Sequence, residues 1–370
     1  MSQKAAIRSE AERFFAAFQA AGAVAFEADH LLPADTLLDL YGEDIRARAY
    51  VTHDPNRGEM MLRPDFTVPV VQRHMSDGAE PARYSYMGEV FRKQEASPAR
   101  ASEYLQVGYE LFDRDDPARA DAEVFALFTT LLAPYGLRAV TGDIGVVLAA
   151  ISALDTTERR KRALRRHVWR PRRFRRLLDR FSGRSDAPAT RAALIAQMAD
   201  LGPEAMIDAT ENWSGLRSPA DVLRRMRALA EDDDAPSISA AQAEALERVL
   251  SLRETLPNAV AQLRDLAVDL PQIDSAISGL VRRIEALSAA GVAVDDLWFE
   301  ASYGRTNMEY YDGFVFGFFN ETDPHMPPVA TGGRYDALTK ILGNGREIAA
   351  VGGVIRPELL HGLSRQEGGI

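Results

Sequence analysis

The stretch that decides the fold runs from Phe91 to Phe112: Phe91-Arg-Lys-Gln-Glu-Ala-Ser-Pro-Ala-Arg-Ala-Ser-Glu-Tyr-Leu-Gln-Val-Gly-Tyr-Glu-Leu-Phe112. Aromatic and apolar residues alternate with small or polar ones at both ends, starting upstream at Tyr84, whereas the middle around Ser97-Pro98 has turn-forming residues. This pattern predicts a strand, a loop and a second strand, joined as a long antiparallel hairpin. Since alternate residues of a strand face the same side of a sheet, we expect Gln106 and Glu110 to share one face.

The same stretch resembles a known signature. Phe-Arg, a short polar loop with a second arginine, and then Gln-x-Gly-x-Glu-x-Phe are similar to the second motif of class II aminoacyl-tRNA synthetases, in the form carried by histidyl-tRNA synthetase. Three further stretches match that family in the right order: Leu62-Arg-Pro-Asp-Phe-Thr67, Met308-Glu-Tyr-Tyr-Asp-Gly313 and Thr331-Gly-Gly-Arg-Tyr-Asp-Ala-Leu338. The four motifs bracket most of the chain, and the resemblance implies an α+β fold in which helices flank an antiparallel sheet.

Periodicity and resemblance together predict where the elements lie. The antiparallel sheet is expected to carry four segments, namely residues 62–67, 84–112, 309–319 and 348–355. Helices are expected over 4–21, 36–42, 67–74 and 121–133, and further strands over 49–53, 59–63, 137–141 and 292–299. The segment 36–42 corresponds to the motif that builds the dimer interface in the family, so the resemblance implies self-association through the N-terminal third.

A change of composition divides the chain into two parts. Residues 1–154 and 290–370 are predicted to form the synthetase-like core, and residues 155–289 an all-helical insertion. The insertion opens with twelve arginines between 159 and 184. Two interpretations of this run stay open: a docking surface for an acidic partner or nucleic acid, or a solvated helix face that is offset by acidic neighbours such as residues 231–234.

The overall composition sets limits on the class of protein. The chain has 370 residues, 46% hydrophobic residues, no cysteine and a formal net charge of -10. The absence of cysteine excludes disulfides, thiol catalysis and Cys-based metal sites, and the absence of a long apolar run predicts no membrane span. The net negative charge makes nucleic acid an unlikely partner for the molecule as a whole. A cytoplasmic location is the default expectation.

The residues of the four motifs are suited to a free amino acid. Such a pocket needs acceptors for the α-ammonium group, a cation for the α-carboxylate group, and an aromatic wall with a few polar groups for a side chain such as imidazole. Eight residues are predicted to line it: Asp65, Thr67, Arg92, Gln106, Glu110, Tyr310, Tyr311 and Tyr335. The acidic and neutral polar residues would receive the ammonium group, Arg92 the carboxylate or, as in the family, a nucleotide phosphate, and the tyrosines would wall the ring.

Each of these residues taken alone has an ordinary structural explanation. A strand tyrosine is more often part of the core, and a strand glutamate more often faces water. The family pattern is what favours a pocket over coincidence. By contrast, His53, His74 and His325 have no metal-ligand spacing, so we expect them to be structural and expect neither a metal nor a cofactor.

The departures from the synthetase pattern point away from catalysis. Gln94 stands where the family has an acidic residue, Thr306-Asn307 where it has Arg-Gly, and Leu359 where it has the arginine that clamps ATP. Asp65 is one methylene shorter than the family's Glu, and the family's C-terminal anticodon-binding domain has no counterpart in the sequence. Amino-acid activation relies on such arginines to neutralise the transferring phosphate. The sequence therefore predicts no aminoacylation of tRNA and no catalytic residues.

A synthetase core of this kind resembles the regulatory subunits of ATP phosphoribosyltransferase, the first enzyme of L-histidine biosynthesis. The resemblance implies a non-catalytic protein that assembles with a short catalytic subunit, is required for its activity and makes it sensitive to histidine. Two alternatives stay open at this point. One is a histidyl-tRNA synthetase-like enzyme that lacks the anticodon-binding domain, and the other is a nucleic-acid-binding module that uses the arginine-rich run.

Overall fold

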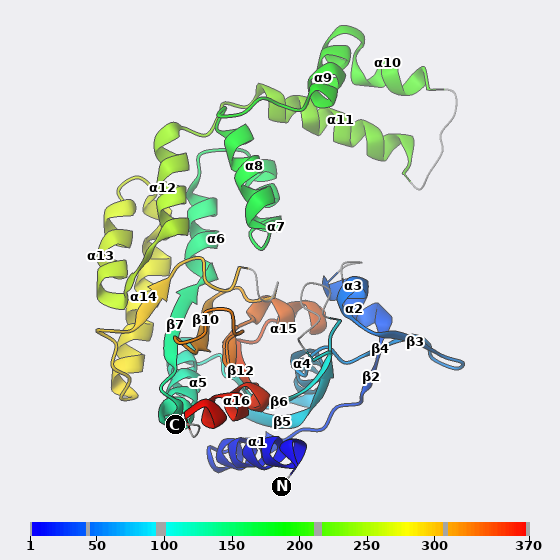
Figure 1. Ribbon diagram of the computed structural model, residues 1–370. Coiled ribbons are helices and arrows are strands. Elements are labelled where there is room, and N and C mark those ends of the chain that lie inside the picture. The colour runs from blue at the N-terminus through cyan, green and yellow to red at the C-terminus, as the bar shows by residue number, and fades with distance from the viewer. Residues whose placement is uncertain (1, 42–44, 94–100, 211–216, 306–309, 368–370) are drawn as a thin grey trace.

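The computed structural model describes residues 2–41, 45–93, 101–210, 217–305 and 310–367. Two sheets and the helices around them form a body, and a helical arm extends from it (Figure 1). The described strands of the larger sheet are, in spatial order, β1 (Val24–Ala25), β5 (Ala82–Phe91), β6 (Glu103–Phe112), β12 (Ala350–Ile355), β11 (Ala330–Arg334), β10 (Phe314–Phe319), β7 (Arg138–Asp143), β9 (Trp298–Glu300) and β8 (Arg253–Thr255). The smaller sheet has the order β2 (Leu31–Pro33), β4 (Gly58–Leu62) and β3 (Val51–Asp54).

Helices cover the sheet and form the arm. Those of the body are α1 (Gln3–Ala20), α2 (Ala34–Tyr41), α3 (Ile45–Arg48), α4 (Thr67–Asp77), α5 (Pro117–Leu132), the 3₁₀ turn η1 (Ala133–Tyr135), α6 (Ile144–Ala153), α15 (Asp336–Leu342) and α16 (Pro357–Glu367). Between residues 155 and 289 lie α7 (Glu158–Arg166), α8 (Pro171–Phe181), α9 (Ala189–Leu201), α10 (Pro203–Asp208), α11 (Pro219–Asp234), α12 (Ala240–Ser251), α13 (Leu256–Leu266), η2 (Pro271–Ile273) and α14 (Asp274–Ala289). Helices α9, α10 and α11 stand farthest from the sheet (Figure 1). None of the helices in the described part of the chain is long and apolar enough to cross a bilayer.

The larger sheet is antiparallel along most of its width. Only β1 with β5 and β7 with β9 pair in parallel, and each of these pairings spans two residue pairs. The predicted α+β class, an antiparallel sheet flanked by helices, is therefore confirmed, with two short parallel pairings at its margins.

The hairpin of β5 and β6 has the predicted form. Its register runs from Ala82 opposite Phe112 to Phe91 opposite Glu103. Tyr86 lies across the neighbouring strand at Gly108, where a Cβ atom would come within 2.1 Å of the tyrosine ring. Gly108 thus allows an aromatic ring to lie flat on the hairpin. The turn itself, with Gln94 and Ser97-Pro98, is outside the described residues.

The two faces of β6 serve different purposes. Val107, Tyr109 and Leu111 belong to the larger hydrophobic cluster, to which α1, α5 and α16 contribute. On the other face, Phe112 joins a second cluster with residues of α4 and α15. Gln106 and Glu110 have the same parity as Phe112, so they share the face that α4 and α15 partly cover.

Several element boundaries differ from the sequence-based expectation. Residues 62–67 were expected in the main sheet, but β4 ends at Leu62 and pairs with β2 and β3 instead. Pro64 has no N–H for a sheet ladder, and α4 begins at Thr67, so the strand cannot continue. The strand expected from 292 is confined to Trp298–Glu300. The strand expected from 309 begins at Phe314, and the described residues 310–313 are not in a strand. The strand β11 and the helix α16 were not predicted.

The region predicted as an all-helical insertion contains one strand. Arg253–Thr255 forms β8 and pairs with β9 at the edge of the main sheet. Further along, Arg283 of α14 is buried and donates to Asp121 of α5 at 2.7 Å and to Asp143 at the end of β7 at 2.6 Å. The last part of this region therefore packs into the body, whereas α9, α10 and α11 form the arm. The boundary between core and insertion at residue 289 stays a prediction.

Candidate functional site

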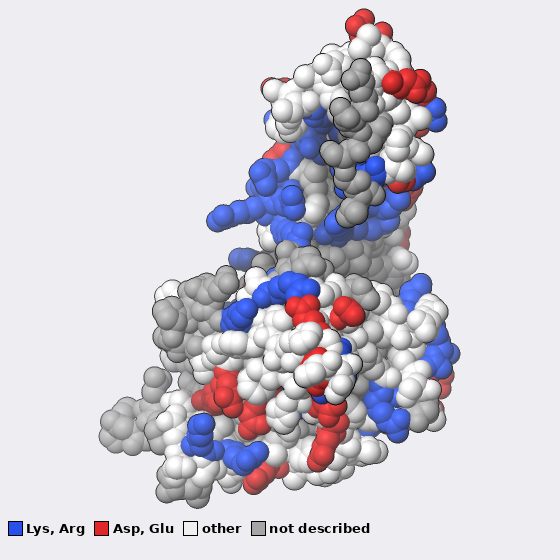
Figure 2. Space-filling model, turned by 90° about the vertical axis from the view of Figure 1, so that its right-hand side faces the viewer, with Lys and Arg blue, Asp and Glu red and all other residues white. Residues whose placement is uncertain are grey.

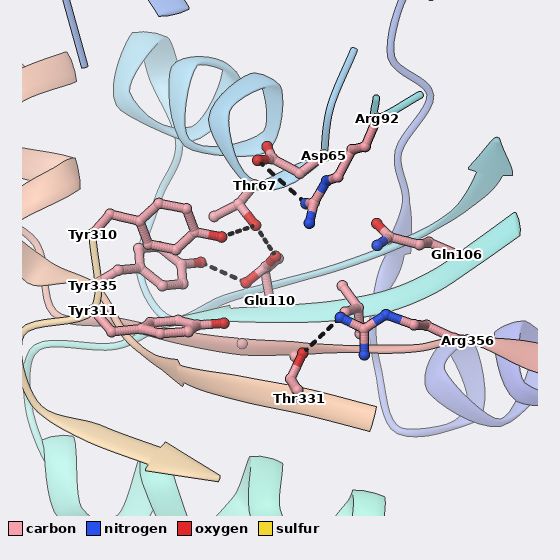
Figure 3. A pocket seen from close by; sticks show the side chains of 13 residues that line it. Asp65, Thr67, Arg92, Gln106, Glu110, Tyr310, Tyr311, Thr331, Tyr335 and Arg356 are labelled. Carbon is pink, nitrogen blue, oxygen red and sulfur yellow. Dashed lines mark hydrogen bonds and ion pairs between the residues drawn. The ribbon is translucent and has the colours of Figure 1, made fainter. Parts of the chain in front are cut away.

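A pocket opens on the α4 and α15 side of the main sheet (Figure 3). All eight residues that the sequence singled out line it, together with Thr331, Gly352, Gly353, Val354 and Arg356. They come from segments far apart in the chain: the start of α4, strands β6, β11 and β12, and the residues that flank β10 and β12. Because the sheet brings these segments side by side, the pocket depends on the whole body.

The carboxylate of Glu110 is the most enclosed polar group of the pocket. Glu110 is only 1% exposed. Its Oε1 atom accepts hydrogen bonds of 3.1 Å from the hydroxyls of Thr67 and Tyr86, and its Oε2 atom accepts one of 2.6 Å from Tyr335. A carboxylate offers about four acceptor positions, so three protein donors leave roughly one for a ligand N–H group.

Burial controls the protonation of this carboxyl group. Desolvation raises the pKa of Glu110 to about 7, against the opposing effect of the three hydroxyl donors, and the charge of Asp65 adds to the rise. The pKa values of Tyr335 and Tyr86 are raised as well, chiefly because both hydroxyls are buried. Near neutral pH, the protonated and ionised forms of Glu110 are thus both populated. A cation that binds beside it would favour the ionised form.

The glycines of β12 determine how close the backbone comes to this carboxylate. A Cβ atom on Gly352 would lie 1.6 Å from Oε2 of Glu110. Any side chain there would push the carboxylate out of its place between the tyrosines. Gly352 is therefore a requirement of the pocket, whereas a Cβ atom on Gly353 would meet the rings of Phe128 and Phe316 in the core.

Three tyrosines form one wall of the pocket. The ring of Tyr310 lies edge-on to those of Tyr311 and Tyr335, with centroids 5.0 and 6.1 Å away. The hydroxyl of Tyr310 is 3.4 Å from the Thr67 hydroxyl, and that of Tyr335 reaches Glu110. Arg334 anchors the chain beside Tyr335, since its guanidinium is paired with Asp121 at 2.7 Å. The sequence Gly-Gly-Arg-Tyr thus holds one wall residue through a buried ion pair.

The opposite end of the pocket carries cations and an unused acceptor. Arg92 donates to the carbonyl of Pro64 at 2.7 Å and lies 4.0 Å from the carboxylate of Asp65. Arg356 donates to the carbonyl of Pro328 at 2.7 Å and to the Thr331 hydroxyl at 3.3 Å. Burial lowers the pKa of Arg356, and no described carboxylate is in ion-pair contact with it. This end of the pocket is suited to an anionic group.

Gln106 lies between Arg92 and Arg356 in the close-up view (Figure 3). It is 1% exposed, and its Oε1 atom accepts no hydrogen bond from the described residues. A buried amide oxygen without a donor carries a desolvation cost that a ligand N–H group would relieve. Gln106 is the one residue of the predicted set whose side-chain acceptor is orphaned in this way.

Sequence reasoning missed two residues of the site: Arg356, which lines the pocket, and Tyr86, which does not line it but holds the carboxylate of Glu110. Tyr86 donates to Glu110, and its place in the alternating strand before Phe91 was the available signal. Arg356 directly follows the last strand. It was missed because the family's third motif has its arginine at the position that Leu359 occupies here. Leu359 is partly buried against the larger hydrophobic cluster, so it is a packing residue.

The other departures from the family pattern are only partly visible. Gln94 and Thr306-Asn307 lie outside the described residues. Arg305, which is one position away from the expected arginine, does not line this pocket; its Nε atom donates to the carbonyl of Val168 at 2.7 Å. His74 is buried and stacks on Phe112, with centroids 4.0 Å apart. Among the described residues, no group of three or more acidic or histidine side chains could hold a metal ion.

Comparison with known proteins agrees with the geometry. A family model described as histidyl-tRNA synthetase matches residues 2–238 and 225–360. A Brucella anthropi protein named ATP phosphoribosyltransferase regulatory subunit is 33% identical over 337 residues, which cover 86% of this chain and 88% of that protein. A Brucella canis protein of the same name is 31% identical over 90% of this chain and 92% of its own length. This chain belongs to the ATP phosphoribosyltransferase regulatory subunits of the histidyl-tRNA synthetase family.

Solved structures show the fold of this family. An ATP phosphoribosyltransferase regulatory subunit/histidyl-tRNA synthetase from Bacillus halodurans superposes with a TM-score of 0.68 at 21% identity, over 97% of this chain and 79% of that one. A histidyl-tRNA synthetase from Nostoc gives a TM-score of 0.65 at 15% identity, over 99% of this chain and 73% of that one. The predicted class II synthetase-like fold of the regulatory subunits is thereby confirmed.

Proposed function

We propose that this chain is a non-catalytic subunit that binds free histidine in the described pocket and assembles with the short catalytic subunit of ATP phosphoribosyltransferase. The relatives' names support the partnership, and the pocket supports the effector. The observation that carries the proposal is the buried, unused acceptor of Gln106 between two arginines, with a tyrosine-lined carboxylate at the far end of the same strand face. An amino acid with a polar ring suits this pocket, because one end is charged and the other is lined by tyrosines around a carboxylate.

The strand geometry supports different roles for the two ends of the pocket in binding histidine. Gln106 and Glu110 are four residues apart, so their Cα atoms are about 13 Å apart along a regular strand. One ammonium group is poorly placed to contact both, and we revise the roles that the sequence suggested. Gln106 and Asp65 receive the α-ammonium group, while Arg356, beside Arg92, receives the α-carboxylate.

The tyrosine end then receives the imidazole ring. Tyr310, Tyr311 and Tyr335 supply the aromatic wall, and the remaining acceptor position of Glu110 takes a ring N–H group. A hydrogen bond between a carboxylate and an imidazole N–H is stronger when either group is charged. This arrangement selects histidine over amino acids whose side chains offer no N–H group at that depth.

The departures from the synthetase pattern support a subunit without its own catalysis. Leu359 packs in the core where the family places an ATP-clamping arginine, and Arg305 is engaged with a carbonyl outside the pocket. Without such cations, charge that develops at a transferring phosphate is poorly stabilised. The isolated chain should give no histidine-dependent exchange of pyrophosphate into ATP above a buffer blank. Clear exchange would refute this part of the proposal.

Feedback inhibition follows if histidine distinguishes two states of the complex. A ligand shifts an equilibrium only when it binds one state more tightly than the other. The decisive experiment is a calorimetric titration of histidine into the complex of this chain with its catalytic subunit, paired with activity assays of the catalytic subunit alone and in the complex. We expect activation by assembly and saturable, inhibitory binding of histidine. Assembly without histidine binding would limit the proposal to the structural partnership.

Self-association is the remaining part of the proposal. Strand β3 is one of the two edge strands of the small sheet. Two large apolar side chains are exposed at its start: Tyr50, just before the strand, by 37% and Val51 by 40%. An open strand edge with apolar side chains is a surface on which a second copy can pair. We propose that two copies associate through the N-terminal third. Val51→Glu should then yield a monomer by light scattering, while Val268→Glu, at an exposed site of the insertion, should leave the assembly unchanged.

A further inference from the structure

A second cavity lies away from the pocket, where helices α8 and α12 meet the loop that carries Arg305. Its volume is about 130 Å³, well above the roughly 10–15 Å³ that one water molecule needs. The lining includes Phe174 and Arg175 of α8, Glu247 of α12 and the side chain of Arg305. The function proposed above does not use any of these residues.

Arg305 is a buried cation without an acidic partner among the residues that the structure describes. It is 7% exposed, its Nε atom donates to the carbonyl of Val168, and its guanidinium stacks on the ring of Phe174 at 5.0 Å. Its Nη2 atom has no hydrogen-bond partner in the described part of the chain. Burial, together with the charge of Arg175, lowers the pKa of Arg305 to about 10. An uncompensated guanidinium in such a place is costly unless an anion pairs with it.

Arg175 supplies a second positive charge to the same cavity. It is exposed and makes no ion pair with the described residues, whereas the one acidic lining residue, Glu247, is paired with Arg184 at 2.9 Å. The cavity therefore has two arginines to offer to a ligand and one carboxylate that is already neutralised. Figure 2 shows that Lys and Arg side chains gather on the part of the arm nearest the body, which extends this positive field beyond the cavity.

We propose that the cavity between α8, α12 and Arg305 binds a phosphate group, either as free phosphate or as the phosphate of a nucleotide. Two adjacent arginines suit an anion that carries up to two negative charges and several acceptor oxygens, which a carboxylate does not provide. The guanidinium of Arg305 uses its Nε atom on the Val168 carbonyl, whereas its buried Nη2 atom has no partner among the described residues and is left to donate to a phosphate oxygen. The contact between the Arg305 guanidinium and the ring of Phe174 helps to hold the cation in place.

The proposed phosphate site involves only part of the arginine-rich run. The sequence left open whether the run binds an acidic partner or nucleic acid, or is only a solvated face. Arg172, Arg173 and Arg176 are exposed on α8 and do not line the cavity, so they contribute a general positive field. Arg305 and Arg175 form a local site, in which a phosphate would be bound by direct contacts that salt screens less than an exposed ion pair.

The test is a calorimetric titration of the full chain with inorganic phosphate and with AMP, at matched ionic strength, with adenosine as the ligand that lacks the phosphate. Arg175→Ala changes an exposed residue of the cavity. Arg305→Lys keeps the buried charge but loses the planar set of N–H donors of the guanidinium. Arg176→Ala is the matched control, because it is exposed on the same helix outside the cavity. We expect both cavity variants to lose at least about tenfold in affinity for phosphate, the effect of one charge-assisted partner, and the control to change less than about twofold.

The source of the phosphate follows from the two ligands. Equal affinity for phosphate and AMP assigns the site to the phosphate group alone, and tighter binding of AMP assigns it to a nucleotide. Equal losses in Arg175→Ala and Arg176→Ala, or no saturable binding at millimolar phosphate, would overturn the proposal. If the protein binds a single-stranded oligonucleotide and each exposed arginine contributes equally to that affinity, the arginine-rich run is a nucleic-acid surface instead.

Discussion

The hydroxyl of Tyr335 donates a 2.6 Å hydrogen bond to Oε2 of Glu110, although 225 positions separate the two residues in the chain. Glu110 is on the central hairpin, and Tyr335 follows β11 in the Gly-Gly-Arg-Tyr segment. The bond thus joins two motifs that sequence analysis could connect only through a family pattern. It also places a carboxylate of raised pKa among aromatic rings, which is the chemical centre of the pocket.

Replacement of Glu110 by alanine is expected to weaken histidine binding strongly. Truncation of one partner of a buried charged hydrogen bond costs about 2–5 kcal/mol, and each 1.4 kcal/mol is about a factor of ten in affinity. Glu110→Ala should therefore lower the affinity at least about thirtyfold in a calorimetric titration of the assembled complex. Activation of the catalytic subunit should persist, because assembly would use outer surfaces and not the pocket.

The matched control for this variant is Glu103→Ala, since Glu103 is an exposed acid at the start of the same strand. It should bind histidine like the wild type. Unchanged affinity in Glu110→Ala would mean that histidine is sensed elsewhere. A complex that no longer assembles would contradict the separation of pocket and partner surface.

Much of this site could be predicted from the sequence because its residues lie in regular strands or beside motif glycines. The alternation in β6 was enough to place Gln106 and Glu110 on one face, and the motif pattern was enough to bring Tyr335 near them. Tyr86 was missed because a tyrosine in an alternating strand resembles an ordinary core residue. Only the glycine opposite it, Gly108, shows that the ring lies across the hairpin.

Protonation of Glu110 should make stability depend on pH. The folded protein holds this proton up to a pKa of about 7, whereas the unfolded chain loses it near 4.5. The contribution of Glu110 to stability is therefore complete below about pH 4.5 and is lost as pH rises through about 7, a difference on the order of 3 kcal/mol. Urea unfolding at several pH values should show the free energy of unfolding falling across this window.

Glu110→Gln isolates that contribution, because a glutamine has no proton to lose. The comparison with wild type is needed since burial also raises the pKa of Asp312 to about 7, so part of the slope comes from that residue. Charged and titratable groups around Glu110, namely Asp65, Tyr86 and Tyr335, stay the same in both proteins. An identical slope in wild type and Glu110→Gln would show that the carboxyl group is not buried in a protonated form.

A buried ion-pair network is expected to be the most sensitive point of the fold. Arg283 pairs with Asp121 and Asp143, and these ion pairs join α14 to the body beside its apolar contacts. Arg283→Met leaves Asp143 without this partner, and breaking such a pair costs about 3–5 kcal/mol. The urea midpoint should fall accordingly, whereas Arg282→Met, at the exposed neighbouring position, should change it little. Equal midpoints for the two variants would contradict a structural role for the network.

This network marks the limit of sequence-based reasoning for the fold. Helical spacing places Arg283 on the same face as Leu280 and Leu287, but it does not show which acidic residues pair with the arginine there. Its partners, Asp121 and Asp143, come from distant parts of the chain. Their approach depends on tertiary packing, so the change of composition that assigned this helix to an insertion could not show that it packs against α5.

Arg356 should determine whether the pocket recognises the carboxylate of its ligand. Histamine is histidine without the carboxylate, so it keeps the ring and ammonium contacts but has nothing to offer Arg356. The wild-type protein should prefer histidine by at least about tenfold, because a buried cation left without its anion is costly. Arg356→Ala should lower the affinity for histidine by an amount on the order of 2–5 kcal/mol and leave the affinity for histamine nearly unchanged.

Comparing histidine with histamine distinguishes a direct contact between Arg356 and the ligand carboxylate from a general effect of Arg356 on the shape of the pocket. If Arg356 only shapes the fold through its bonds to Pro328 and Thr331, its loss should weaken both ligands equally. If Arg92 alone holds the carboxylate, the preference for histidine should survive in Arg356→Ala and disappear in Arg92→Ala. A preference that vanishes only with Arg356 would place the carboxylate at the end of β12, beside the unused acceptor of Gln106.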